Sequence, residues 1–504
     1  MSAGDGSAVS FQGHLLRNRK AEMKNPHAHN RRRLAEKVGA DGLAVVMAGA
    51  PVLRNPDVDF AFRQDSDFFY LTGFDEPHAA AVIAPGHPEG DFTLFVQPRD
   101  RQREIWDGPR VGTEGAREIY GADASYPVAQ FDSRLLQLAE GRSVMWHSLA
   151  GGDRSRQVMT LLEKAHALRT RLGVDLPRHV SDLRPVLAEL RLLKSPQEIQ
   201  WLREACDLTM EGHREAMRFA APGRWEYQVQ AAMENVWRMG GSPRDGYPSI
   251  VASGPNSCIL HYVDNNRRME DGDLLLVDAA CELHHFTSDI TRTSPVSGSY
   301  TTPQLRAYQV VLDAQEAAIA ACRPGNHIRS PHEAALGILV EGMVEMGLLP
   351  SGAEDALSMH LYQEFFMHGT SHWLGMDVHD VGSYRPAGAH RLLEPGMALT
   401  VEPGLYVDPS RPEVEFAMLE FDSDQWMTER MLDSSAAGRH KELRDTAPKV
   451  KHPIPPELLG IGIRIEDDVV ITSGGCEVLT ADLPKAPDEV EELCRESPRH
   501  SRHP

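Results

Sequence analysis

The stretch that decides the fold is DGDLLLVDAACELHHFTSDITRTSPV, residues 271–296. Leu274–Val277 is an apolar run that predicts a buried strand ending at Asp278, and the threonine-rich TSDITRT predicts a second strand that carries Asp289. A tight turn at Leu283-His284 would join the two strands as an antiparallel hairpin and set Asp278 directly opposite Asp289. Cross-strand partners share one face, with Cβ atoms ~5 Å apart.

Two carboxylates this close repel each other unless they share a proton or a cation. The leucines and valine beside them imply burial, so a bound metal is the better explanation. The alternative is a solvated hairpin with two surface aspartates.

Two further carboxylates stand where strands are expected to end or turn. Glu402 follows the apolar run of MALTVEPGLYV (397–407) and precedes a Pro-Gly pair. In GIGIRIEDDVVIT (460–472), alternation places three isoleucines on one strand face and Arg464 and Glu466 on the other. A strand-edge ion pair is the alternative for Arg464 and Glu466, and such pairs contribute little to stability.

Three histidines lie close together in HGTSHWLGMDVHD (368–380). His368, His372 and His379 could be three ligands of one zinc ion, one ligand with two helpers, or structural histidines. One histidine and four carboxylates would carry roughly four negative charges, enough to neutralise two divalent ions. Oxygen-rich ligation favours Mn²⁺ or a similar hard ion over a structural zinc ion, which favours cysteine ligands.

Composition narrows the classes of protein that fit. The chain has 504 residues, of which 52 are basic and 73 acidic, and its formal charge is −21. Such an acidic surface repels nucleic-acid phosphates, so we expect no nucleic-acid partner. The 6 scattered cysteines form no C-x-x-C pair, which favours free thiols. The N-terminus lacks the pattern of a signal peptide, and GLAVVMAGAPVL (42–53) is too short to span a bilayer. We therefore expect a cytoplasmic protein with no membrane association.

The length predicts two domains. Between residues 31 and 180, helical stretches alternate with the apolar runs GLAVVMAG, AAAVIAPG, DFTLFVQP and SVMWHSL, which predicts an α/β domain. We place the N-terminal domain at residues 1–180 and the second domain at 181–504. The basic run Arg31, Arg32, Arg33 is interpreted as the solvated face of an N-terminal helix.

Beyond residue 180 the pattern predicts two amphipathic helices and then strands. The first helix begins at Ser195-Pro196 and ends at Pro222-Gly223, and the second ends at Gly240-Gly241. The charged, proline-bearing tail 485–504 is expected to be frayed.

Five segments in the same order resemble the Xaa-Pro aminopeptidases (aminopeptidase P) of the pita-bread metallopeptidase family. They are ILHY (259–262), VDAACELHHFTSDITRT (277–293), FFMHGTSHWLGMDVHDVG (365–382), LEPGMALTVEPGLYV (393–407) and GIGIRIEDDVVIT (460–472).

The N-terminal half resembles the family's non-catalytic domain through FRQDSDFFYLTGFDEP (62–77) and REIWDGPRVG (103–112). The resemblance covers about residues 31 to 485. It implies a creatinase-like α/β N-terminal domain and an α+β pita-bread catalytic domain with a curved antiparallel sheet.

The resemblance implies five metal ligands. Asp289 and Glu466 would bridge two divalent ions, Asp278 would bind one ion, and His372 and Glu402 would bind the other. Mn²⁺ is the expected metal, with Zn²⁺ and Co²⁺ as alternatives. The hairpin expected over residues 271–296 predicts the pairing of Asp278 with Asp289 independently of the resemblance.

The resemblance also implies the reaction. Two ions would activate water to attack the peptide bond between the first residue and a proline at position two. Glu402 would act as general base, His379 would donate a hydrogen bond to the developing oxyanion, and His261 would assist from the other side. Each of these histidines could instead have a purely structural role. The motifs around His379 and His261 favour the catalytic interpretation for these two residues.

Four more residues would shape the substrate site. His368 would contact the substrate near the proline subsite, and Tyr406 and Arg464 would form the substrate end. Trp106 matches a tryptophan that, in this family, can reach a neighbouring subunit's site. That contact would require a homo-oligomer, either a dimer or a tetramer.

One segment departs from the family. Residues 408–459 separate two strands that each deliver a ligand, and the family commonly has a shorter connection there. This insertion could be a lid or interface element that limits substrate length, or a passive surface decoration.

Two other functions stay open. A prolidase would use the same fold and ligands on Xaa-Pro dipeptides alone. A pita-bread protein that binds partners without catalysis would be expected to lose metal ligands, whereas all five are present here.

Overall fold

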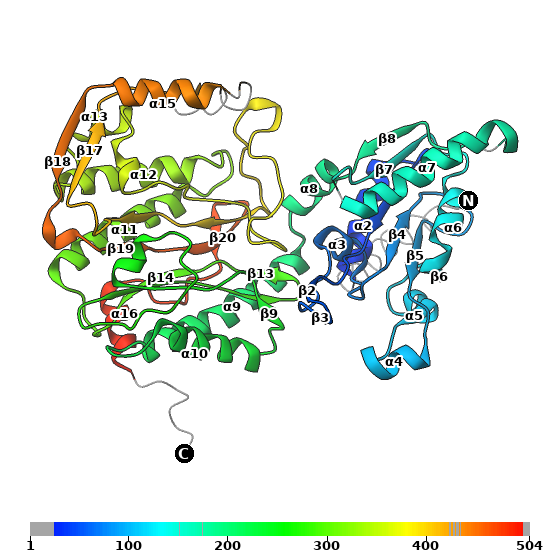
Figure 1. The fold of residues 1–504 in the computed structure, drawn as a ribbon, viewed down its shortest axis with the longest axis horizontal. Helices are drawn as coiled ribbons and strands as arrows, with labels where there is room; N and C mark the ends of the chain where they lie inside the picture. The colour runs from blue at the N-terminus through cyan, green and yellow to red at the C-terminus, as the bar shows by residue number, and fades with distance from the viewer. Residues whose placement is uncertain are drawn as a thin grey trace, which may run out of the picture. The chain divides into compact units, whose positions relative to one another are not determined.

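A computed structural model describes residues 25–496 of the protein except 151, 174, 423–424, 427–428, 430–432 and 434. The chain divides into two compact units between Gln197 and Glu198 (Figure 1). The boundary expected at residue 180 falls earlier, in strand β8 (His179–Asp182). A search of the described residues finds no helix long and apolar enough to cross a membrane.

The first unit is built on a six-stranded mixed sheet. Central β1 (Gly42–Met47) pairs antiparallel with β4 and parallel with β7. The four apolar runs of the sequence form β1, β4, β5 and β7, so the α/β prediction is confirmed. In spatial order the strands are β6 (Ala124–Pro127), β5 (Phe92–Val96), β4 (Ala80–Ile83), β1, β7 (Val144–His147) and β8.

Helices and one small hairpin complete the described part of the first unit. Apolar residues of α6 and α7 pack against β1 and form its core with Leu43 and Val45. The helices are α2 (Pro26–Val38), α3 (Ser66–Thr72), α4 (Arg101–Asp107), α5 (Gly112–Glu118), α6 (Phe131–Ala139), α7 (Gly152–Leu172) and α8 (Arg184–Leu192), and the hairpin strands are β2 (Leu53–Asn55) and β3 (Val58–Asp59).

The expectation that Arg31 lies on a solvated helix face is wrong. Arg31 is 8% exposed, donates a 2.8 Å hydrogen bond to the carbonyl of Leu71, and lies 4.1 Å from the ring centroid of Phe92. Burial lowers its pKa to about 10. Its long stem and planar head let one arginine of a basic run pack inward while Arg32 stays exposed.

The second unit begins with the two predicted helices, α9 (Pro196–Phe219) and α10 (Glu226–Met239). Val229, Met233 and Trp237 of α10 are fully buried against strands β10 and β11. In Figure 1, α9 and α10 lie below strand β14 (Thr291–Pro295), and α11 (Thr302–Ala321) and α12 (Ser330–Glu345) lie above it.

Strand pairs are antiparallel throughout the described part of the second unit, as expected for a pita-bread domain. Its sheets have the orders β10-β11-β14, β13-β12-β9, β15-β20-β21, β16-β19 and β17-β18. The strands are β9 (Arg244–Asp245), β10 (Ile250–Ser253), β11 (Leu274–Asp278), β12 (Cys281–Leu283), β13 (Phe286–Thr287), β14 (Thr291–Pro295), β15 (Ala398–Val401), β16 (Gly404–Tyr406), β17 (Glu413–Ala417), β18 (Lys449–Pro453), β19 (Gly462–Arg464), β20 (Asp467–Ile471) and β21 (Cys476–Val478).

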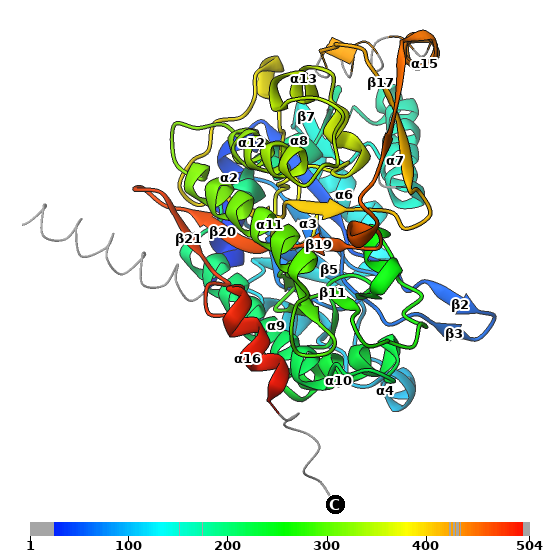
Figure 2. The same ribbon diagram turned by 90° about the vertical axis from the view of Figure 1, so that its left-hand side faces the viewer.

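The prediction of a frayed tail from residue 485 is wrong over its described part. Pro487–Arg495 forms helix α16, seen beside α11 in Figure 2. Val490 and Leu493 are buried against Met217 of α9, and Arg218 Nε donates a 2.7 Å hydrogen bond to Glu496. An apolar pair three residues apart gives the helix a buried face despite its charged composition. Residues 497–504 lie outside the described residues.

The insertion 408–459 carries β17, β18 and helix α15 (Ala436–Thr446). Its described residues pack on the segment around α13 (Ala353–Ser358). The rings of His360 and Phe421 pack in a tilted arrangement with centroids 4.4 Å apart, and Arg411 forms an ion pair with Glu364 at 2.7 Å. None of the described insertion residues lines the cavity around Asp278, Glu402 and Glu466.

Candidate metal centre

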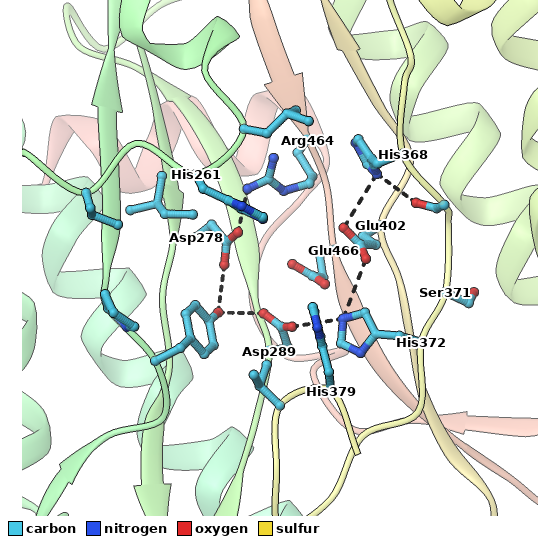
Figure 3. A pocket seen from close by; sticks show the side chains of 17 residues that line it. His261, Asp278, Asp289, His368, Ser371, His372, His379, Glu402, Arg464 and Glu466 are labelled. Atoms are coloured by element: carbon cyan, nitrogen blue, oxygen red, sulfur yellow. Dashed lines mark hydrogen bonds and ion pairs between the residues drawn. The ribbon is translucent and has the colours of Figure 1, made fainter. Parts of the chain in front are cut away.

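The second unit holds a cavity of about 540 Å³ at the ends of its strands. It collects most of the residues singled out from the sequence, and Figure 3 shows their side chains converging. Those that line it are His261, Asp278, Asp289, His368, His372, His379, Glu402, Arg464 and Glu466. Tyr406 lies behind the wall, and Trp106 lies in the first unit.

The hairpin register differs from the prediction. Asp278, at the end of β11, faces Thr291 rather than Asp289. The turn is at His284-His285, with φ of 54° and 63°, and Leu283 pairs with Phe286. Two residues with positive φ make the tight hairpin turn, which places the turn one residue later than expected. Asp278 and Asp289 are diagonal neighbours on one face, so they still meet.

Tyr247 connects these two aspartates, and the sequence prediction missed it. Its hydroxyl lies 2.6 Å from Asp278 Oδ1 and 2.5 Å from Asp289 Oδ1. Since Ile250 of β10 pairs with Asp278, residues just before β10 lie beyond the end of β11. That pairing was the signal that could have located Tyr247, and it depends on a contact that short-range patterns do not reveal.

Backbone contacts fix the remaining carboxylates. The N–H of Glu402, just after β15, donates to Thr370 at 2.9 Å. Glu466 precedes β20; its N–H donates to the Thr291 carbonyl at 3.0 Å, and the Thr291 hydroxyl donates to its Oε2 at 2.6 Å. Both faces of the extended segment 461–466, which contains β19, are therefore buried, one in the core and one in this cluster.

Asp289 is held by a buried residue that the sequence prediction also missed. The Asp289 N–H donates a 2.9 Å hydrogen bond to Asp468 Oδ2. Cys206 Sγ lies 3.3 Å from the same oxygen.

His372 lies among the carboxylates. Its Nε2 is 3.2 Å from Asp289 Oδ2 and 3.6 Å from Glu402 Oε1. Although burial opposes the charged imidazole, Asp289 and Glu402 raise the pKa of His372 to about 9. One ligand atom each from Asp289, His372 and Glu466 lies within 4.8 Å of the others.

The carboxylates are crowded in a place that disfavours their charge. Burial raises the pKa of Glu402 to about 7, against the opposing charges of His372 and Arg464. Burial and the neighbouring Asp289 raise the pKa of Glu466 well above its usual range. A divalent cation would offset this repulsion, so the donor set fits a metal site in which oxygen ligands predominate.

The other two histidines of the 368–380 motif have different partners. His379 packs edge-on against His372, with ring centroids 4.3 Å apart. His368 Nε2 lies 2.8 Å from the Tyr406 hydroxyl, and burial beside Arg464 lowers the pKa of His368 to about 3. Only His372 of the three belongs to the group of described residues that could hold a metal ion.

Arg464 links Asp278 to Tyr406 and Thr291. Its guanidinium contacts Asp278 Oδ2 and donates to the Tyr406 hydroxyl at 2.9 Å and to Thr291 Oγ1 at 3.1 Å. In contrast, Trp106 lies on α4 of the first unit and is 84% exposed.

An antiparallel domain that brings buried carboxylates and histidines together around one cavity is typical of metal-dependent hydrolases. The profile of metallopeptidase family M24 matches residues 200–473, and that of the aminopeptidase P N-terminal domain matches residues 27–146. The chain therefore belongs to the aminopeptidase P family of M24 metallopeptidases.

Similar proteins span both units. The Xaa-Pro aminopeptidase of Escherichia coli (strain K12) is 37% identical over 466 residues, covering 92% of this chain and 96% of the relative. The Homo sapiens Xaa-Pro aminopeptidase 3 is 31% identical and covers 91% and 82%. The structure of Pseudomonas aeruginosa aminopeptidase PepP has a TM-score of 0.83 at 38% identity, covering 93% of this chain and 97% of that one. Escherichia coli aminopeptidase P with the inhibitor Pro-Leu has a TM-score of 0.81 at 37% identity and the same coverage.

Proposed function

We propose that this metallopeptidase is a Xaa-Pro aminopeptidase, which removes the first residue of a peptide whose second residue is proline. The observation that carries the proposal is the buried carboxylate and histidine cluster, in a chain similar over nearly its whole length to Xaa-Pro aminopeptidases. The Pro-Leu inhibitor of the Escherichia coli enzyme supports a site for proline-containing peptides.

Five residues are proposed to hold two divalent ions: Asp278, Asp289, His372, Glu402 and Glu466. The oxygen-rich set favours Mn²⁺, and a zinc-substituted Escherichia coli relative supports Zn²⁺ as a second metal. When bound, such a pair of ions polarises the scissile carbonyl and activates water.

The residues of the chain supply proton transfer and orientation. Glu402 is the proposed general base, because its carboxylate lines the cavity beside His372, within reach of a water activated there. His379 and His261, both on the cavity wall, are proposed to donate hydrogen bonds to the oxyanion.

The substrate end of the site is assigned to His368, Tyr406 and Arg464, which form a continuous hydrogen-bonded chain. Burial keeps His368 neutral, so it can contact an uncharged proline ring without carrying charge into the subsite.

Trp106 is proposed to reach the site of a neighbouring copy in a homo-oligomer, a dimer or a tetramer. Its 84% exposure, with Ile105 at 75%, leaves an apolar pair on α4 available for such a contact. Light scattering measures the mass in solution, and Trp106→Ala is expected to lower peptidase activity. A monomer with unaltered Trp106→Ala kinetics would contradict this assignment.

The deciding experiment compares three peptides with chelator-treated protein after Mn²⁺, Zn²⁺ or Co²⁺ is added. We expect release of the first residue from a Xaa-Pro-Yaa tripeptide and none from the matched Xaa-Ala-Yaa control. Cleavage confined to the Xaa-Pro dipeptide would identify a prolidase instead. Glu402→Ala is expected to abolish turnover, and unchanged turnover would remove Glu402 from the mechanism.

A further inference from the structure

The segment that carries His261 is anchored on the side that faces away from the cavity. It spans residues 254–267, starting with the short helix η2 (Gly254–Cys258) after β10. His261 is exposed and lines the cavity, where Figure 3 shows its ring pointing inward. The next residue, Tyr262, is 9% exposed and packs in the core with Ile250 and Tyr406. The two neighbours thus point to opposite sides, and Tyr262 anchors the segment.

A single buried carboxylate accepts hydrogen bonds from several residues of this segment. Glu226, the first residue of α10, is fully buried. Its Oε1 accepts hydrogen bonds from the Ser253 N–H and hydroxyl, each at 2.7 Å, and from Asn256 Nδ2 at 3.2 Å. Its Oε2 accepts from the Tyr262 hydroxyl and the Arg267 N–H, each at 2.8 Å. Donors from the beginning, middle and end of the segment therefore share one acceptor.

The second anchor is Asn265. Its Oδ1 accepts from the Val251 N–H at 2.9 Å, and its Nδ2 donates to the Ser249 carbonyl at 2.8 Å. Asn265 has a φ of 46°, which turns the chain back toward β10. His261 therefore lies on a stretch that is fixed at Asn256 on one side and at Tyr262 and Asn265 on the other.

Charge makes the Glu226 anchor strong. Hydrogen bonds to an ionised acceptor are about twice as strong as neutral ones, and a buried carboxylate needs all of them to offset its lost hydration. Glutamine has the same shape, but its amide nitrogen would face hydrogen-bond donors instead of accepting from them. A Glu226→Gln change therefore weakens several of these contacts at once without leaving a cavity.

We propose that Glu226 is a positioning residue, which holds the 254–267 segment so that His261 faces the reacting carbonyl. Glu226 does not line the cavity and acts only through that segment. The inference rests on the oxyanion role proposed above for His261.

A double-mutant cycle separates this role from general support of the fold. We expect Glu226→Gln to lower kcat by about ten-fold with a smaller change in KM, because the His261 contact strengthens in the transition state. In a His261→Ala background, the same change is expected to alter kcat by less than about two-fold. Equal losses in both backgrounds, or no loss in the parent, would overturn the proposal.

Two further measurements keep the test decisive. Tyr262→Phe removes the single donor next to His261 and takes the place of Glu226→Gln if that variant fails to fold. In the Glu226→Gln variant, amide hydrogen exchange of residues 254–267 is expected to become faster, while that of 274–278 stays unchanged. This measurement tests whether Glu226 holds the segment in place, and it does so even if the protein cleaves no Xaa-Pro peptide. Unaltered exchange in 254–267 would contradict positioning in that case as well.

The matched control is Glu491→Gln. Glu491 also accepts a backbone N–H, from Tyr300 at 2.9 Å, but on α16 and outside the cavity lining. We expect this variant to leave kcat and the exchange of 254–267 unchanged.

Discussion

Tyr247 has one hydroxyl proton and two carboxylate neighbours. It fixes the rotamers of Asp278 and Asp289 before any cation binds, because its oxygen lies within 2.6 Å of both side chains. Groups that orient metal ligands typically contribute ten- to hundred-fold to metal affinity. We therefore expect Tyr247→Phe to weaken Mn²⁺ binding about ten-fold, measured by titration calorimetry.

Tyr70→Phe is the control for that titration. Tyr70 is also buried and donates to a backbone carbonyl, that of Leu190 at 3.1 Å, in the first unit. Its loss is expected to leave Mn²⁺ affinity unchanged, and equal effects of both variants would contradict a specific role for Tyr247.

His332 provides a pH-dependent contribution to stability. It is hydrogen-bonded to Thr370 at 2.9 Å, and burial with help from Arg329 lowers its pKa from 6.5 to about 4. A histidine with a lowered folded-state pKa stabilises the fold above its unfolded pKa, and the contribution is lost as pH falls from 6.5 toward 4. Urea unfolding at pH 7 and 4.5 is expected to show a drop in unfolding free energy that is about 2 kcal/mol smaller in His332→Asn.

His179→Asn, at an exposed position, should leave the drop unchanged. A His332→Asn variant with the full drop would show that another group is responsible.

Single residues at strand ends were predictable, whereas their neighbours in space were not. Asp278, Glu402 and Glu466 each stand at the end of an apolar run that predicts burial. A charged carboxylate is disfavoured in a buried position, and this conflict is visible in the sequence. The sequence around Tyr247 and Asp468 contains no pattern that indicates a role in the site. Their roles arise from the pairing of β10 with β11 and from the approach of β20 to the hairpin.

At the scale of elements, α16 shows that a charged segment can be part of the core. Val490 is 0% exposed against α9, so Val490→Ala removes two buried methyl groups. We expect a loss of about 2 kcal/mol in unfolding free energy by urea denaturation. Glu492→Ala, on the exposed face of the same helix, should stay within about 0.5 kcal/mol of the parent, and a similar loss in both would argue against packing as the cause.

Strands and helices were well predicted because hydrophobic periodicity reflects burial. The register of the 271–296 hairpin was not, because it depends on which residues adopt positive φ in the turn. Histidines at 284 and 285 give no such signal, since asparagine and glycine are the residues expected there. A shift of the turn by one residue moved the partner of Asp278 from Asp289 to Thr291 and kept both aspartates on one face.

At the scale of the whole molecule, metal binding and stability should be coupled. The candidate site brings together buried carboxylates whose mutual repulsion a divalent ion would relieve, so Mn²⁺ is expected to raise Tm in a concentration-dependent way and chelation to lower it. Calorimetric scans measure both shifts.

Glu466→Gln tests the origin of that coupling. Burial and Asp289 already disfavour the ionised Glu466 side chain, so its neutral isostere should keep the Tm of the metal-free protein while losing the response to Mn²⁺. A large fall in the Tm of the metal-free variant would show that the charge itself supports the fold.

The order of the candidate ligands along the chain has a consequence for biosynthesis. They extend from Asp278 to Glu466, all downstream of the first unit, and Glu466 lies between strands β19 and β20. N-terminal domains generally fold first as a chain leaves the ribosome. A nascent chain is therefore expected to carry a folded first unit while its set of candidate ligands is still incomplete, and that set would be complete only after Glu466 has been translated.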